Sequence, residues 1–175
     1  MEPQISTTTD AAQMALMQKK VALSSKFKVG VNWFFWIAGL SLVNTVIYLF
    51  GSTLTFVVGL GATQIIDGFM SAFGAQMGQS GMVARIIGFV LDLGIAGVFV
   101  LFGVFGRKRH RWAIITGIVF YVVDGILLLL FRDFLGAAFH AWALFGIAGS
   151  LKAIKELENL EKSTFTGTFQ NINPQ

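Results

Sequence analysis

Three consecutive stretches decide the fold class: ARIIGFVLDLGIAGVFVLFGVFG (84–106), RKRHR (107–111) and WAIITGIVFYVVDGILLLLF (112–131). A helix rises about 1.5 Å per residue, so about twenty apolar residues cross the ~30 Å hydrocarbon core of a bilayer. A short basic cluster between two such runs is typical of a cytoplasmic turn. These stretches therefore predict a transmembrane helical hairpin.

Two more apolar runs lie on either side of this hairpin, NWFFWIAGLSLVNTVIYLFG (32–51) and FLGAAFHAWALFGIAGS (134–150). Trp and Tyr residues near the ends of the first run match the aromatic belts of membrane helices. Charged residues make up only 13% of the chain, about half the share found in soluble domains. The sequence thus predicts four hydrophobic spans, the last two joined by a minimal turn at Arg132 and Asp133.

Residues 53–73 are ambiguous, because their apolar run is interrupted by glycine and by polar residues such as Thr63 and Gln64. Ile65, Ile66 and Phe69 then recur at helical spacing, which indicates a helix with one apolar face. The segment is either a fifth span, a re-entrant piece or a helix lying in the interface, and residues 74–81 are expected to form a loop.

The distribution of basic residues favours four spans. With four spans, every Lys and Arg except Arg85 and Arg132 lies on the side of both termini, in accord with the positive-inside rule. A fifth span would divide the basic residues nearly evenly. We therefore predict an all-α integral membrane protein, a four-helix transmembrane bundle with an extracytoplasmic interfacial or re-entrant segment. Both termini are expected in the cytoplasm.

The regions outside the spans give a simple domain plan. Residues 1–10 are expected to be a disordered N-terminus, and residues 11–28 a cytoplasmic basic amphipathic helix, either on the membrane surface or solvated. The transmembrane domain covers residues 29–151. A cytoplasmic helix extension follows at 152–162, and residues 163–175 are expected to be a disordered tail.

One polar residue interrupts each span, and each lies about six to eight residues, or ~9–12 Å, from the predicted outer end. Because a charge facing lipid is costly, these residues should turn inward and find partners. They form either a polar or proton-linked site or an interhelical clamp that fixes packing. Asp67 and Arg85 are a possible outer-surface extension of this predicted intramembrane polar layer, whose members are Asn44, Asp92, Asp124 and His140.

The amino-acid composition limits the kinds of catalytic and binding site that the chain can form. The chain has no Cys and two His, with no HExxH spacing, so the sequence predicts neither a thiol nucleophile nor a metal or other cofactor. The net charge of +4 is better explained by anionic lipid than by nucleic acid. Contact with such lipid is expected at the cytoplasmic basic segments, including the basic loop of Arg107, Lys108, Arg109 and Arg111.

Twenty glycines, many within the spans, predict close helix packing or a self-association face, and hence a possible homo-oligomer or membrane-protein partner. The favoured function is a non-enzymatic interaction or accessory component. The alternative is a small proton- or cation-linked transporter or channel subunit that uses the Asp and His layer. An intramembrane enzyme is the third hypothesis.

The chain resembles a family of small uncharacterised bacterial polytopic membrane proteins over roughly residues 32–155. The resemblance rests on GLSLVN (39–44), TQIID (63–67) and Asp124 with Phe139 and His140. It implies a bacterial cytoplasmic (inner) membrane location and supplies no activity.

Overall fold

The computed structural model describes residues 5–50, 59–76 and 81–172, and these fold into five α-helices. Four of the helices are long and apolar enough to cross a membrane, while the shorter second helix is not among them. The prediction of an all-α chain with four helices able to span a membrane is therefore confirmed. The helices are α1 (Ile5–Leu49), α2 (Gly61–Gln76), α3 (Gly81–Arg107), α4 (Arg111–Leu130) and α5 (Phe134–Ile172).

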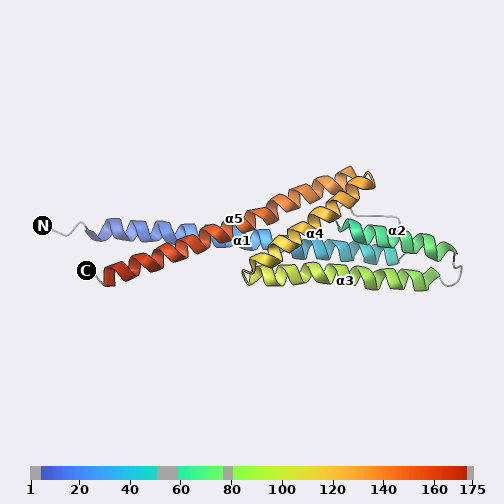
Figure 1. Cartoon of the computed structure of the whole chain (residues 1–175), viewed down its shortest axis with the longest axis horizontal. Coiled ribbons are helices and arrows are strands. Elements are labelled where there is room, and N and C mark those ends of the chain that lie inside the picture. Colours follow the sequence, from blue (N-terminus) through green and yellow to red (C-terminus); the bar gives the residue numbers. More distant parts are fainter. Residues whose placement is uncertain (1–4, 51–58, 77–80, 173–175) are drawn as a thin grey trace.

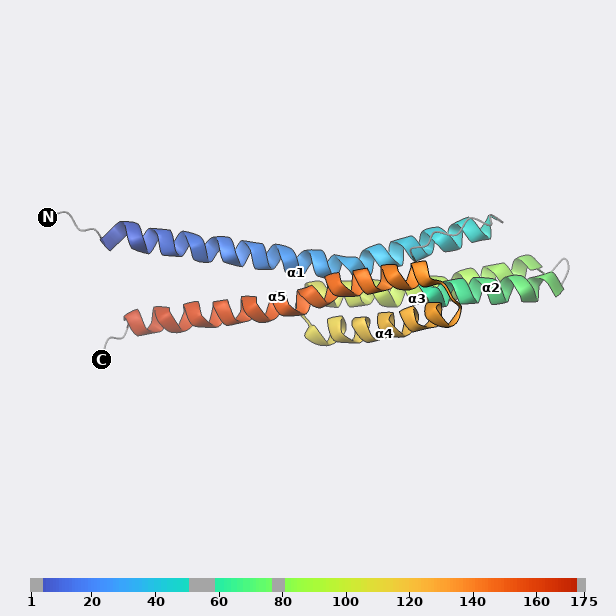
Figure 2. The same cartoon turned by 90° about the horizontal axis from the view of Figure 1, so that it is seen from above.

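The four long helices run alternately up and down the bundle. Helix α1 begins and α5 ends at the same end of the molecule, and both project toward that end beyond the turn between α3 and α4 (Figure 1). Helix α2 starts near the opposite turn, between α4 and α5, and runs outward alongside α3 (Figures 1 and 2). Because the four long helices alternate in direction, the described chain begins and ends at the same end of the molecule.

Two helices are longer than the sequence analysis expects. The predicted amphipathic helix 11–28 and the first span are one continuous helix, and α5 joins the last span, its extension and residues 163–172. No proline interrupts either helix, and each added residue gains a helical hydrogen bond. Residues 5–10 and 163–172 are helical where disorder is expected, and residues 1–4 and 173–175 lie outside the described residues.

The predicted short turns are present. In the turn between α3 and α4, Arg109 has a φ of 66° and the His110 N–H donates to the Phe105 carbonyl at 3.1 Å. In the turn between α4 and α5, Arg132 has a φ of 61°. The Asp133 carboxylate accepts a hydrogen bond from the Gly136 N–H at 2.9 Å and caps α5.

The core of the bundle is aromatic and aliphatic, and glycines bring the helices close. The Phe34 ring of α1 covers Gly117 of α4, and the Phe35 ring covers Gly103 of α3. A side chain at either glycine would collide with these rings. Close packing therefore explains several of the span glycines, whereas Gly39, Gly94 and Gly97 face open space.

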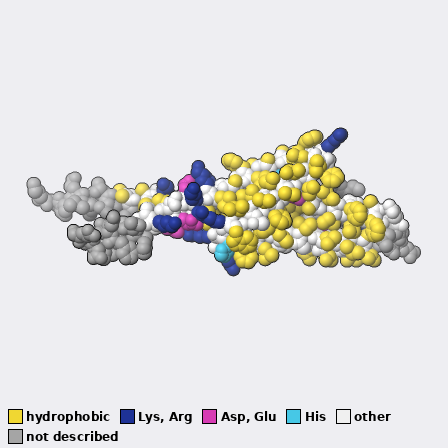
Figure 3. Space-filling view, viewed as in Figure 1, with side chains coloured by type: hydrophobic (Ala, Val, Ile, Leu, Met, Phe, Trp, Pro, Cys, Tyr) yellow, Lys and Arg dark blue, Asp and Glu magenta, His cyan; other side chains and the backbone are white. Residues whose placement is uncertain are grey.

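The outer surface of the bundle is apolar over most of the visible face (Figure 3). Exposed residues such as Val90, Val119 and Leu129 would face water in a soluble protein. Lys and Arg side chains gather where this apolar surface gives way to the projecting ends of α1 and α5 (Figure 3). That pattern is the expected outline of a bilayer interface.

Candidate functional site

The four residues of the predicted polar layer are all buried. Asn44, Asp92, Asp124 and His140 retain exposed fractions of 4%, 0%, 5% and 1%, and they come from α1, α3, α4 and α5. Among the described contacts, however, they do not form a single ring. They divide into a group around Asp124 and a group around Asp92.

Asp124 holds the first turn of α2. Its Oδ2 accepts a hydrogen bond from the Gly61 N–H at 2.7 Å, and its Oδ1 accepts one from the Ala62 N–H at 2.8 Å. The first N–H groups of a helix have no intrahelical partner, and a carboxylate there also meets the positive end of the helix dipole. Gly61 is needed because a Cβ would lie 2.8 Å from the Leu128 side chain.

His140 completes this group on the other side of Asp124. Its Nε2 lies 2.7 Å from Asp124 Oδ2, and its Nδ1 lies 2.9 Å from the Gly136 carbonyl oxygen. A carbonyl only accepts, so Nδ1 carries a hydrogen. The close approach of Nε2 to the carboxyl oxygen then requires a second proton between the two residues. Tyr121 stacks on the imidazole with ring centroids 4.1 Å apart.

The chain just before α2 is also held by polar side chains of α1. Leu60 is completely buried, and its N–H donates to Ser41 Oγ at 2.7 Å. The side-chain amide of Asn44 lies against Gly59. Non-helical backbone is tolerated at membrane depth only where protein satisfies its polar groups. Ser41 and Asp124 thus supply the partners that the start of α2 needs.

The second group contains two carboxyl groups. Asp92 Oδ2 accepts a hydrogen bond from Thr45 Oγ1 at 3.0 Å, and the Asp67 carboxyl of α2 lies within hydrogen-bonding reach of the Asp92 carboxyl. The Oδ1 atoms of both aspartates are buried without a hydrogen-bond partner. Two adjacent carboxylates repel each other, so this arrangement needs a shared proton or a cation.

The two residues predicted as an outer-surface extension have different surroundings. Asp67 is buried and belongs to the carboxyl pair. Arg85 is half-buried and lines a hollow of about 360 Å³ between α2 and α3, together with Ser71 and Met82.

The basic loop folds back on α1 and α5. Arg107 donates to Asn32 Oδ1 at 3.0 and 2.8 Å, and its guanidinium lies over the Phe35 ring. Arg109 and Arg111 form ion pairs with α5, to Glu161 at 3.1 Å and to Glu158 at 2.6 Å. Lys108 lies over the Phe105 ring. The loop therefore joins helices at this end of the bundle.

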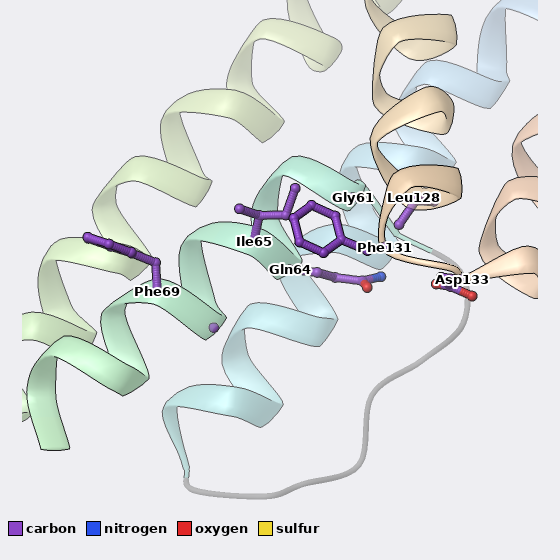
Figure 4. A pocket seen from close by; sticks show the side chains of 8 residues that line it. Gly61, Gln64, Ile65, Phe69, Leu128, Phe131 and Asp133 are labelled. Atoms are coloured by element: carbon purple, nitrogen blue, oxygen red, sulfur yellow. The ribbon is translucent and has the colours of Figure 1, made fainter.

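A crevice of about 490 Å³ lies between α2 and the end of α4, beside Gly61 (Figure 4). Leu128, Ile65 and Phe131 give it apolar walls, and the polar side chains that line it are Gln64 and Asp133. The crevice reaches the backbone that Asp124 holds, whereas Asp124 itself is not part of the lining.

Sequence reasoning missed several participants. Ser41 and Thr45 belong to the same helical face as Asn44, and this spacing of three and four residues is a signal that would have included them. No residue spacing in the sequence points to Tyr121. The backbone N–H groups of α2 cannot be identified from a sequence, since every residue except proline has one.

No family model, curated protein or solved structure matches the chain. Within the described part of the chain, no three His, Asp or Glu side chains are placed to hold a metal ion together. The function must therefore be argued from the site and the surface alone.

Proposed function

We propose that the chain is a four-span protein of the bacterial cytoplasmic membrane, with both termini in the cytoplasm and α2 as a re-entrant helix on the outer side. Nearly all Lys and Arg lie toward the end of the molecule where α1 begins and α5 ends, and this distribution supports the proposed orientation. The length of α2 supports re-entry, because its 16 residues span ~24 Å and so fall short of the ~30 Å hydrocarbon core. The start of α2 is buried in the bundle, so the chain would re-enter the bundle there before α2 runs outward again.

We propose further that the protein acts as an interaction or accessory component, and that it binds its partner through the arm of α1. We define the α1 arm as residues 10–22, the part of α1 that projects beyond the bundle (Figure 1). The exposed apolar face of this arm is the observation that carries the proposal. Met14, Met17 and Val21 lie on that face with exposed fractions of 59%, 69% and 69%.

The apolar face is distinct from the one that packs on α5. Leu16, Leu23 and Phe27 are half-buried or buried and lie on a different face of α1. Met14, Met17 and Val21 follow each other at intervals of three and four residues on a neighbouring face, so they form one stripe. Flexible methionine side chains suit a protein-binding surface. Lys20, three residues after Met17, favours a partner with an acidic group beside its apolar surface.

The bundle interior supports the same conclusion. The described partners of Asp124, His140 and Ser41 are groups of the protein itself. These residues therefore have a sufficient role in holding α2, which favours the interhelical clamp over a polar-ligand site for this group.

Photocrosslinking tests the role of the α1 arm. A photocrosslinking amino acid at position 17 should give one discrete protein adduct in membranes of the source cell. The same group at position 19, on the opposite face of the helix, should give none. Met14→Gln with Val21→Gln should abolish the adduct at position 17. Equal adducts at both positions, no adduct at position 17, or an adduct that survives the double substitution would contradict the proposal.

A proton-linked transporter or channel subunit is a second candidate, and the Asp67 and Asp92 carboxyl pair favours it. The pair holds two buried oxygens without hydrogen-bond partners and lies between α2 and α3. Proteoliposomes with an internal pH dye test this function. The hypothesis predicts proton flux that Asp92→Asn abolishes while the protein stays folded. Flux no greater than in protein-free vesicles would rule it out.

A further inference from the structure

We infer that the groove between α1 and α5 at the cytoplasmic end of the bundle binds an anionic phospholipid. The groove has a volume of about 760 Å³, within the range of known ligand sites. Its lining includes two basic residues, Lys26 and Lys152, and two large aromatic residues, Trp33 and Phe145. This inference does not depend on the partner proposed for the α1 arm.

Close contact of the two helices creates the groove. At Gly30 of α1, a Cβ would lie 2.7 Å from the Gly146 carbonyl oxygen and 2.7 Å from the Ser150 side chain. The helices therefore meet backbone to backbone at this point. Beside the contact, the Trp33 indole covers Gly146. Gly149 leaves the floor open, because a Cβ there would meet only the end of Lys26, at 3.8 Å.

The polar and apolar ends of the groove follow the order of a phospholipid. Lys26 precedes Trp33 by seven residues on α1, and Lys152 follows Phe145 by seven on α5. Because the two helices run in opposite directions, the lysines share one end and the aromatic rings the other, about 10 Å away. A phosphate between the lysines would thus be followed by acyl chain along the aromatic wall.

The position along the bundle also fits a lipid. Asn32, next to Trp33, contacts Arg107 at the end of α3, so the aromatic end lies level with the boundary of the bundle. Lys26 and Lys152 lie about two turns farther toward the end where α1 begins and α5 ends. Basic side chains gather at that side of the apolar surface (Figure 3).

Charge complementarity selects an anionic headgroup. The charged side chains that line the groove are the two lysines, and no carboxylate joins them there. In the described structure, neither lysine forms an ion pair, whereas Arg109 and Arg111 nearby are paired with glutamates. A zwitterionic headgroup would also bring its own positive charge close to the lysines, so its electrostatic attraction to the groove would be weaker.

Quenching of Trp33 by brominated lipid tests the site. Trp36, Trp112 and Trp142 are replaced by Phe, and the protein is reconstituted with acyl-brominated phosphatidylglycerol or phosphatidylcholine at equal mole fraction. We expect an apparent affinity about tenfold higher for phosphatidylglycerol, since each lysine near an anionic headgroup contributes. Circular dichroism and gel filtration establish that each variant is folded.

Two variants and a matched control make the test specific. Lys26→Gln with Lys152→Gln should reduce the preference to about one, and Gly149→Leu should weaken it by filling the groove without changing charge. Lys28→Gln with Lys155→Gln removes the same charge from the same helices outside the groove and should keep the preference. Equal quenching by both lipids in the starting protein would overturn the inference. So would a preference that survives Lys26→Gln with Lys152→Gln, or one that the control also loses.

Discussion

Asp124 and Asp92 are both buried aspartates in long apolar helices, yet their surroundings differ. Both oxygens of Asp124 accept hydrogen bonds from backbone N–H groups, and His140 adds a third contact. Asp92 has one hydroxyl donor and a neighbouring carboxyl, and its Oδ1 has no hydrogen-bond partner. The environment of Asp124 demands a carboxylate, whereas that of Asp92 does not.

This difference indicates that Asp124 has a structural role, whereas Asp92 could bind a proton or a cation. A carboxylate at a helix N-terminus whose two oxygens both accept hydrogen bonds from the protein holds the fold. A carboxyl pair with spare oxygens holds little in place and retains room for a proton or a cation. Substitutions that keep shape and change hydrogen bonding should therefore affect the two sites very differently.

Asp124→Asn should have the largest effect. The amide NH₂ that it introduces must face one of the N–H groups of α2 or the imidazole, so a buried donor loses its acceptor. We expect a loss of about 3–5 kcal/mol in the free energy of unfolding, as for breaking a buried ion pair. Thermal unfolding in detergent micelles, followed by circular dichroism, measures it. A loss below about 1 kcal/mol would show that α2 is held by other contacts.

Ser41→Ala should come next. It leaves the buried N–H of Leu60 without its acceptor, which is expected to cost about 1–3 kcal/mol. The same unfolding measurement applies. Ser41→Thr is the control, because it keeps the hydroxyl and should restore most of the stability if the hydrogen bond is the cause.

Thr45→Val should have a smaller effect of about 0.5–1.5 kcal/mol. It keeps the side-chain shape and removes the hydroxyl that donates toward Asp92 Oδ2. Combined in a double-mutant cycle with Asp92→Leu, which cannot accept the hydrogen bond, it should show coupling, since residues 45 and 92 are in contact. Strict additivity would indicate that the hydrogen bond contributes nothing.

Asp92→Asn should have the smallest effect, a change of less than about 1 kcal/mol in either direction. The new amide still accepts from Thr45 and can donate toward Asp67, so the shared proton is no longer required. Unfolding of this variant beside Asp124→Asn gives the comparison directly. Equal losses for the two isosteric changes would refute the distinction between the sites.

Much of the fold follows from the sequence because lipid imposes a strict rule on long apolar runs. The ends of the predicted spans 84–106 and 112–131 lie within three residues of the ends of α3 and α4. The continuity of α1 was not predictable in the same way. The predicted helix 11–28 and the first span from residue 32 leave a break around Gly30, but this glycine lies inside α1 and lets α5 approach.

The candidate site was predictable only in its buried side chains. The cost of charge in lipid places Asp92, Asp124 and His140 inside the bundle. Their partners depend on where α2 begins, and a backbone N–H at Gly61 has no sequence signature. Asp67 shows the same limit, because its burial follows from the packing of α2 on α3.

If α2 does not cross the membrane, as proposed, the α1 arm and the turn between α3 and α4 lie on the same side. The chain contains no Cys, which allows labelling of single-cysteine variants with a membrane-impermeant maleimide. Lys19→Cys and Lys108→Cys should both react only from the cytoplasmic side, and Ala75→Cys, near the end of α2, only from the outside. Reaction of positions 19 and 108 from opposite sides would establish a fifth crossing and contradict the account.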